Sequence, residues 1–484
     1  MPSEEMTFSW SPHGGVTEAL YNLGALVAVG IAVASVVANP RPLLLLLAVA
    51  IGIGWVAGRA EFGVWLIALL TVIETVGPLS FSLTKAAKLG LTAVVVGALL
   101  LRTAERTSSP EDPYRWPLGL LLATAFIATL ISASPLSSML GLASLLAFVL
   151  YYTAVRRSRV LLQGGPQLLK TVLWTAIPTA VLCLVQLSQG YKGLLASKEQ
   201  LSSEAAGELN TIWPGIERAS ALFNGPSACG AFLGVAAVIA VTHAAVFRKS
   251  RFGYAVGSAV CLSGVFATFS RGALLGFFAG VTFSSWSMGF LNRRRMLAVG
   301  FSFVAIFATL FGIDEVKAYL RLGSALADVS PSRIDAWQSA VVVIRRFPVF
   351  GIGFYQFQDL SRGIAGVVDT ARHPHNGFLK ATVEQGPIGG CAYLLFVVIF
   401  LRTSRRSLRR ASGPEQNWIL GSIAGAGAAL FTQELFDANL TSGGSSIAIL
   451  FAAMLGLQTS LIDGDAVESD QQGAYSPARG SAPA

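Results

Sequence analysis

Charge is the scarcest property of this sequence. Only 13% of its 484 residues are Asp, Glu, Lys or Arg, against about 25% in soluble domains, and 53% are hydrophobic. Histidine and cysteine are also rare, with four residues of each type. This composition excludes an ordinary soluble globular protein. It predicts an all-α fold, a polytopic membrane helix bundle with a long, partly helical loop outside the membrane.

The four cysteines lie singly inside apolar runs, and no CxxC motif occurs. The spacing therefore gives no support to a zinc or redox motif, and it favours small hydrophobic side chains within helices. These residues are Cys183, Cys229, Cys261 and Cys391. We also expect no cleavable signal peptide, because Glu4 and Glu5 stand where such a signal carries Lys or Arg.

Apolar runs of about twenty residues, the length that spans a bilayer, recur along the chain and predict about 12–14 transmembrane helices. The runs are 18–38, 42–58, 62–81, 85–101, 116–134, 136–154, 167–187, 225–247, 252–269, 272–290, 296–312, 377–401, 416–435 and 443–462. They define a short N-terminus (1–16), three membrane regions (17–187, 225–312 and 377–462), two polar loops (188–224 and 313–376) and a Ser/Gly/Gln/Pro-rich tail (463–484). The tail is predicted to be disordered.

The formal net charge of +9 comes from basic residues clustered between the apolar runs. Such clusters mark cytoplasmic loops, so they indicate membrane topology rather than a nucleic-acid partner. An even number of predicted spans separates each cluster from the next, which places every cluster and both termini on the cytoplasmic side. The clusters fall within 102–115, 156–159, 248–251, 293–295 and 402–410.

Both polar loops and the short junction Ser270-Arg271-Gly272 then face the outside. The junction interrupts an apolar run, from Phe252 to Leu291, that is too long for one helix. We expect two helices joined by a tight turn, with Ser270 as the cap and Gly272 permitting the bend. Arg271 would lie near the outer membrane boundary, where a cation costs less free energy than at the bilayer centre.

An amphipathic helix is predicted at about residues 331–346, on the outer interface or packed on the bundle. Ser330-Pro331 is typical of an N-cap followed by proline at the first helical position. Pro348 and the Gly351-Ile352-Gly353 turn would end the helix. Its predicted apolar positions recur at helical spacing, at Ile334, Trp337, Val341 and Ile344.

Three arginines on the predicted outer face, Arg218, Arg271 and Arg333, are candidates for binding a polyanion. Guanidinium groups match phosphate oxygens in two-pronged hydrogen bonds, which favours a phosphate-containing substrate. The alternative is that each arginine reaches the lipid headgroups, and that Arg218 pairs with Glu217.

His375 is a candidate general base. Asn376 is the expected N-cap of the following helix and a candidate substrate-binding residue. His375 would then lie at the positive end of a helix dipole, which disfavours a charged imidazole and leaves a neutral base. The alternative is a capping or surface histidine.

Acidic residues are few, and we see no acidic pair in the outer loops that would hold a divalent cation. We therefore expect no metal site and no cofactor. Some acids in or near apolar runs are alternatively proton relays of a transporter, or are paired internally or lie at helix ends. These are Glu74, Glu384, Glu434 and Asp437.

Four stretches in the second half of the chain carry a family resemblance. They are RASALFNGPSACGAFL (218–233), TFSRGALLGFFAGV (268–281), SRIDAWQSAVVVIRRFPVFGIGFYQF (332–357) and HPHNGFLKATVEQGPIGG (373–390). Together they resemble the O-antigen ligase and polymerase superfamily of bacterial membrane glycosyltransferases. By motif position, the resemblance implies functional roles for Arg271, Arg333 and His375, and by a weaker match for Arg218.

The resemblance implies a metal-independent enzyme that moves a glycan from an undecaprenyl-diphosphate carrier at the periplasmic face of the bacterial inner membrane. A ligase gives the glycan to a sugar of lipid A-core, a polymerase to another lipid-linked repeat unit, and relatives glycosylate pilin. Which acceptor this chain uses stays open. In the mechanism that we expect, Arg271 and Arg333 clamp the diphosphate while His375 takes a proton from the acceptor hydroxyl.

Two other classes remain as alternatives. One is a multispan transporter or flippase for a lipid-linked or anionic substrate, although no internal repeat is evident and the break at residues 270–272 falls at a membrane face. The other is a peptidoglycan-type polymerase, whose expected catalytic aspartate in an outer loop has no clear counterpart here, which leaves only Asp328 and Asp335 as candidates.

Overall fold

A computed structural model describes residues 112–157, 160–189, 218–223, 225–292, 294, 333–357, 374–438, 440 and 445–474. Within these ranges the regular structure is helical and no strand occurs, which confirms the all-α class. The predicted spans before residue 112 and the span 296–312 lie outside the described residues, as do Glu74, Glu217, Asp328 and Ser330-Pro331.

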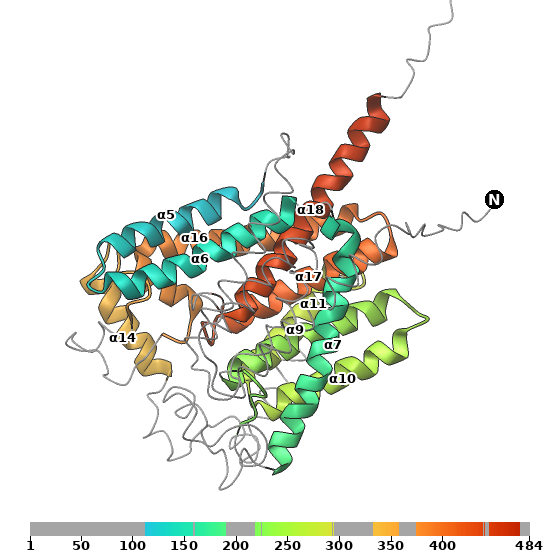
Figure 1. Cartoon of the computed structure of the whole chain (residues 1–484), viewed down its shortest axis with the longest axis horizontal. Helices are drawn as coiled ribbons and strands as arrows, with labels where there is room; N and C mark the ends of the chain where they lie inside the picture. The colour runs from blue at the N-terminus through green and yellow to red at the C-terminus, as the bar shows by residue number, and fades with distance from the viewer. Residues whose placement is uncertain are drawn as a thin grey trace, which may run out of the picture.

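The helices follow the predicted segments in order (Figure 1). α7, α16 and α18 are longer than predicted, since polar residues at their ends continue the helix. The helices are α5 (Arg115–Leu130), α6 (Pro135–Arg157), α7 (Val160–Gln189), α9 (Pro226–Val246), α10 (Arg251–Ala267), α11 (Arg271–Ser287), α14 (Arg333–Arg346), α16 (Gly377–Arg410), α17 (Pro414–Gln433) and α18 (Ser446–Ala474).

Length and composition allow three of the described helical segments to cross a membrane. They are Gly165–Ser188, Pro226–Val246 and Gly377–Arg410. Three further helical segments are apolar but shorter, Arg115–Leu130, Arg251–Ala267 and Ile447–Ile462.

α18 departs from the sequence prediction at its C-terminal end. It continues to Ala474, so the backbone of residues 463–474 is helical where disorder was expected. In Figure 1 this last part of α18 extends away from the other helices. The prediction of disorder rested on composition. Composition does not show that a well-packed helix continues into a polar segment.

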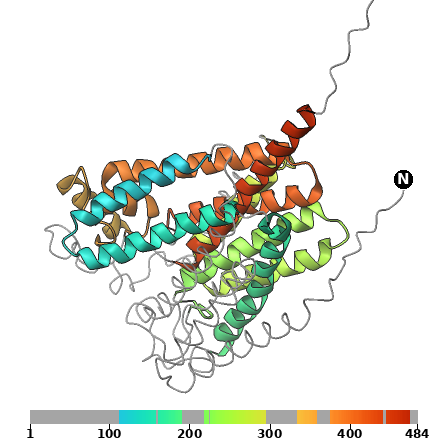
Figure 2. The ribbon, with the colours of Figure 1, turned by 45° about the horizontal axis from the view of Figure 1, so that its top comes forward.

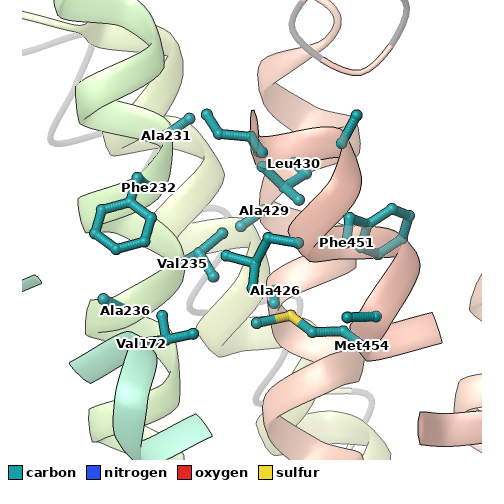
Figure 3. Close-up of a cluster of buried hydrophobic side chains, with 14 of the residues drawn as sticks. Val172, Ala231, Phe232, Val235, Ala236, Ala426, Ala429, Leu430, Phe451 and Met454 are labelled. Atoms are coloured by element: carbon teal, nitrogen blue, oxygen red, sulfur yellow. The ribbon is translucent and has the colours of Figure 1, made fainter. Parts of the chain in front are cut away.

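The core forms where α9 and α17 meet, with α18 beside them (Figure 3). Small residues let the backbones approach closely, as is common in membrane helix pairs. A Cβ atom added to Gly276 of α11 would lie 2.6 Å from the carbonyl oxygen of Ala429 in α17, and one added to Gly280 would lie 2.5 Å from that of Gly425. Glycine is therefore required at both places.

One end of the bundle is basic. The end of α11 meets the start of α17, where a Cβ added to Gly421 would lie 2.7 Å from the Met288 sulfur. The end of α9 is there too, because Trp418 Nε1 donates to the Ile239 carbonyl at 3.4 Å. The Arg405 guanidinium lies 3.6 Å from the Trp286 ring centroid. The described basic residues after α9, after α11 (Arg294) and at the end of α16 thus share one end, which is the arrangement that the predicted topology requires.

α16 has a break that the sequence analysis missed. Gly386 adopts φ 76°, and Pro387 follows it. Proline has no N–H for the Val383 carbonyl, so that oxygen would lack its helical partner. Instead the Ile352 N–H donates to it at 3.0 Å, and the Gly353 N–H donates to the Glu384 carbonyl at 3.2 Å. The chain after α14 thereby satisfies the broken helix.

α14 packs through a face that only partly overlaps the predicted one, since Ile344 is partly buried against the same cluster but the fully buried positions are others. Its buried residues are Ala336, Ser339, Ala340 and Val343, whereas Val341 is exposed. The helix belongs to a cluster with Val383 of α16, so it packs on the bundle. Small side chains form the contact because they allow closer approach to α16 than bulky ones. Figure 2 shows α14 beside the near end of α16.

Candidate functional site

The junction between α10 and α11 is a tight turn with Arg271 at the start of the second helix. Ser270 is the N-cap, and its hydroxyl accepts a hydrogen bond from the Ala273 N–H at 3.4 Å, as predicted. The bend itself is not made by Gly272, which was the wrong choice: Phe269 takes the left-handed conformation, with φ 51°. A Cβ added to Gly272 would lie 3.3 Å from Phe436 and 3.4 Å from Gln433, so this glycine serves helix packing.

Arg218 lies at the same turn. Its Nε donates to the carbonyl oxygen of Thr268 at 3.0 Å, and the Ala219 N–H donates to the carbonyl of Ala267 at 3.1 Å. A cation suits this position, because the carbonyl groups at the C-terminal end of α10 are partly negative. Arg218 thus binds the turn three residues before Arg271, while a shared role of the two arginines stays a prediction. Both side chains are half-buried.

His375 and Asn376 stand at the start of α16. The Asn376 side-chain oxygen accepts from the Leu379 N–H at 2.9 Å, which confirms the predicted N-cap. Its Nδ2 donates to the Leu435 carbonyl at 3.1 Å, just beyond the end of α17. His375 is half-buried and has φ 49°, a strained conformation for a residue with a side chain.

The end of α17 connects these two places. The Gly377 N–H donates to the Glu434 carbonyl at 2.7 Å, which joins α16 to α17. On the other side Gln433 packs near Gly272, and its Nε2 donates to the Ser227 carbonyl at 2.9 Å in the first turn of α9. The N-terminal ends of α9, α11 and α16 therefore gather around residues 433–436. Helix N-terminal ends carry partial positive charge and favour an anion.

Backbone strain marks the same four sequence stretches that carry the family resemblance. In the described part of the chain, the non-glycine residues with positive φ are Ala221 (48°), Phe269 (51°), Tyr355 (62°) and His375 (49°). Each stretch contains one of them. Strained residues that the surrounding structure holds in place are concentrated at functional sites. This distribution supports the placing of the site at this end of the bundle, opposite the basic end.

Residues 256–394 match the family model described as O-antigen ligase. The match confirms the predicted resemblance to the O-antigen ligase superfamily. It covers most of α10, all of α11 and α14, and the first half of α16, and so includes Arg271, Arg333 and His375. A comparison with curated proteins gives no match. The O-antigen ligase match suggests a glycosyltransferase-type enzyme, and together with the apolar helices it indicates an integral membrane protein.

For Arg333, which lies within the matched region, the structure gives the position of the backbone alone. Arg333 is the first residue of α14, and its side chain lies outside the described ones. Ala336, one turn later, belongs to the buried cluster against which Leu379 of α16 packs. The structure therefore brings α14 beside the first turns of α16, while a contact between Arg333 and the substrate stays a prediction. The Asp335 side chain is likewise outside the described set.

Sequence reasoning missed Gln433, which helps to join the helices of this candidate site. Gln433 was not singled out, although it lies beside Glu434 at the end of an apolar run, which is the signal that would have found it. The Glu434 carboxylate accepts from the Leu440 N–H at 2.6 Å and from the Tyr393 hydroxyl at 3.4 Å. Glu384 is paired with Lys380, with 3.4 Å between Oε1 and Nζ. These acids thus follow the alternative of internal pairing or a helix-end position.

An apolar cavity lies beside the polar site, between α5, α6, α16 and α18. The space amounts to about 660 Å³, including open solvent at its mouth. Leu440 and Tyr393, which both bond to Glu434, are part of its wall. Among the described residues no group of three His, Cys, Asp or Glu side chains is placed to hold a metal ion.

Proposed function

We propose that this chain is a metal-independent glycosyltransferase. It would transfer a glycan from an undecaprenyl-diphosphate carrier to an acceptor sugar at the periplasmic face of the bacterial inner membrane. The observation that carries the proposal is the gathering of Arg218, Arg271 and the start of α16, with His375, around the end of α17. This arrangement joins cationic groups to a candidate base at one end of a membrane helix bundle.

In the proposed reaction the acceptor hydroxyl oxygen attacks the anomeric carbon of the donor glycan. The bond between that carbon and the diphosphate oxygen breaks, and the lipid diphosphate leaves. His375 takes the proton of the attacking hydroxyl, which is work for a neutral imidazole. Arg271 and Arg333 hold the diphosphate and stabilise the negative charge that grows on it, with Arg218 nearby.

The apolar cavity supports a lipid-linked donor. Its wall is built from hydrophobic side chains, among them Leu118, Phe148 and Phe396, and a polyprenyl tail is equally apolar. Two residues of its wall, Tyr393 and Leu440, donate to the Glu434 carboxylate, and the Glu434 carbonyl accepts from the start of α16. A tail in the cavity would therefore leave its diphosphate near the starts of α11 and α16.

The experiment is a transfer assay with purified protein, a synthetic undecaprenyl-diphosphate glycan and a sugar acceptor. The proposal predicts an elongated or transferred product, at a rate that EDTA does not change. A protein that moves the lipid across vesicle membranes without forming product would instead be a flippase. Transporters also contain broken helices such as the kinked α16. The assay must therefore distinguish glycan transfer from lipid transport.

The acceptor is decided by a deletion strain analysed on a gel. Loss of a ligase leaves polymer on its lipid carrier and a bare lipid A-core. Loss of a polymerase leaves the core capped with single repeat units, and loss of exopolysaccharide alone indicates an exopolysaccharide polymerase. Each outcome assigns one acceptor class to the same donor chemistry.

A further inference from the structure

A buried ion pair lies in the first turns of α16. Lys380 Nζ is 3.4 Å from Glu384 Oε1, and the two side chains are only 6% and 2% exposed. Burying two charges costs much of what their attraction returns, so such a pair is weak evidence of a stabilising role. Neither residue belongs to the proposed clamp or base. Their role follows instead from the segment after α14, which both side chains contact.

Glu384 holds the segment that follows α14. Its carboxylate accepts backbone hydrogen bonds from Tyr355 and Phe357. Its own carbonyl oxygen accepts from the Gly353 N–H at 3.2 Å. One residue of α16 thus binds three positions of the chain that leaves α14.

Lys380 completes the attachment from the side nearer His375. Its Nζ lies 4.7 Å from the centroid of the Tyr355 ring, a cation–π distance, as well as beside Glu384. Its backbone N–H donates to the Asn376 carbonyl at 2.9 Å, in the turn that begins directly after His375. Tyr355 itself has φ 62°, so its neighbours must hold it in a strained conformation.

The segment also contacts α5, where Ala125 and Ala128 pack with Phe354, and α6. The Ser138 hydroxyl donates to the Phe354 carbonyl at 2.6 Å, and a Cβ added to Gly141 would lie 2.8 Å from the Tyr355 Cβ. Because α5, α6 and α16 all contact this short segment, we expect a change at Lys380 or Glu384 to shift the segment relative to α16. We do not expect it to release the segment as a free loop.

We propose that Lys380 and Glu384 are positioning residues that fix α14, and with it Arg333, relative to the start of α16 and His375. Glu384 supplies the acceptor for the segment after α14, and Lys380 pairs with that carboxylate and with the Tyr355 ring. The expected effect on transfer activity rests on the proposed glycosyl transfer. The expected effect on the position of α14 does not depend on that function.

The test measures both consequences in the purified full chain. Spin labels are attached to cysteines introduced at the exposed positions Gln338 in α14 and Phe378 in α16, and they report the distance between the helices. The exposed Cys391 is replaced by Ser so that it takes no label. The parent is expected to give one narrow distance distribution, and Lys380→Met and Glu384→Ala a broad or shifted one. The same variants without labels should lose about a hundredfold in kcat, with less change in KM for the donor, as misplacement of reacting groups does.

The double variant Lys380→Glu with Glu384→Lys exchanges the two charges. It distinguishes the loss of the hydrogen-bond acceptor at position 384 from the loss of the charge pair. It keeps the pair but leaves no acceptor at position 384 for the Tyr355 and Phe357 N–H groups. Our proposal predicts that the broad distance distribution and low kcat persist. Recovery of both in the swapped protein would overturn it.

A matched control is the ion pair of Arg156 and Asp112 near the basic end, with 2.9 Å between its atoms and 11% and 16% exposure. Arg156→Met should lower the melting temperature yet leave the distance between α14 and α16 narrow and kcat unchanged. If Lys380→Met behaved as Arg156→Met does, the pair would be structural only and the proposal wrong. A changed distance in a chain whose parent transfers no glycan would instead refute the proposed function alone.

Discussion

The N–H of Gly377 donates a 2.7 Å hydrogen bond to the carbonyl oxygen of Glu434, residues that are 57 positions apart in sequence. This bond joins the start of α16 to the end of α17. Since α17 also packs against the start of α11 at Gly272, the helices that carry His375 and Arg271 are located by one shared element.

Replacing His375 separates its chemistry from its backbone conformation. His375→Gly removes the imidazole but suits the positive φ, so the fold should be unchanged or slightly more stable. His375→Ala removes the imidazole and keeps the strain. Both should lose about 10²–10⁴-fold in kcat, which is the usual contribution of a general base. Full transfer activity of the glycine variant in the purified assay would remove the base from the mechanism.

Asn376 is expected to affect stability more than chemistry. Asn376→Ala removes the cap on Leu379 and the bond to the Leu435 carbonyl, and loss of an N-cap costs about 1 kcal/mol. Asn376→Asp keeps the capping acceptor but loses the donor. A thermal melt in detergent should rank the three proteins as parent, aspartate and alanine in falling order. Equal melting temperatures would contradict the importance of this cap.

Gly276 tests the close packing of α11 on α17. Gly276→Ala places a Cβ atom 2.6 Å from the Ala429 carbonyl oxygen, so the helices must separate, and overpacking of this kind costs about 1–3 kcal/mol. Gly253→Ala in α10 is the control, because nothing lies within 4 Å of its added Cβ. It should leave stability unchanged or raise it by up to about 1 kcal/mol. The packing argument fails if both variants melt alike.

Gln433 is expected to matter although it is not a proposed catalytic group. Gln433→Leu keeps the volume but removes the 2.9 Å bond to the Ser227 carbonyl, which leaves that oxygen without this partner. We expect a loss of about 1–3 kcal/mol in stability and a fall in kcat. Gln433→Glu also loses the donor and should behave similarly. Parent-like kinetics in both would show that α9 and α17 keep their places without this bond.

The sequence predicted the helices well because long apolar runs and punctuating residues are local signals. Asn376 and Ser270 were found as caps for the same reason, since capping depends on neighbours three residues away. Gly272 was misassigned because its reason for being glycine is Gln433 and Phe436, which are distant in sequence.

The partly buried site itself needed the structure. The sequence placed Arg218, Arg271 and His375 on one predicted side of the membrane, but their common support at residues 433–436 depends on helix packing that no local pattern encodes. The kink of α16 was missed because Pro387 is compatible with a continuing membrane helix when another segment satisfies the freed carbonyl, and here that segment is Ile352 and Gly353.

The most direct test of the account is the effect of Arg271 on transfer from a synthetic undecaprenyl-diphosphate glycan by the purified protein. Arg271→Ala should abolish product, and Arg271→Lys should lose most activity because an ammonium group cannot reproduce the two-pronged contact with phosphate oxygens. Both variants should reach the membrane and melt close to the parent. Near-normal transfer by either variant would contradict the diphosphate clamp.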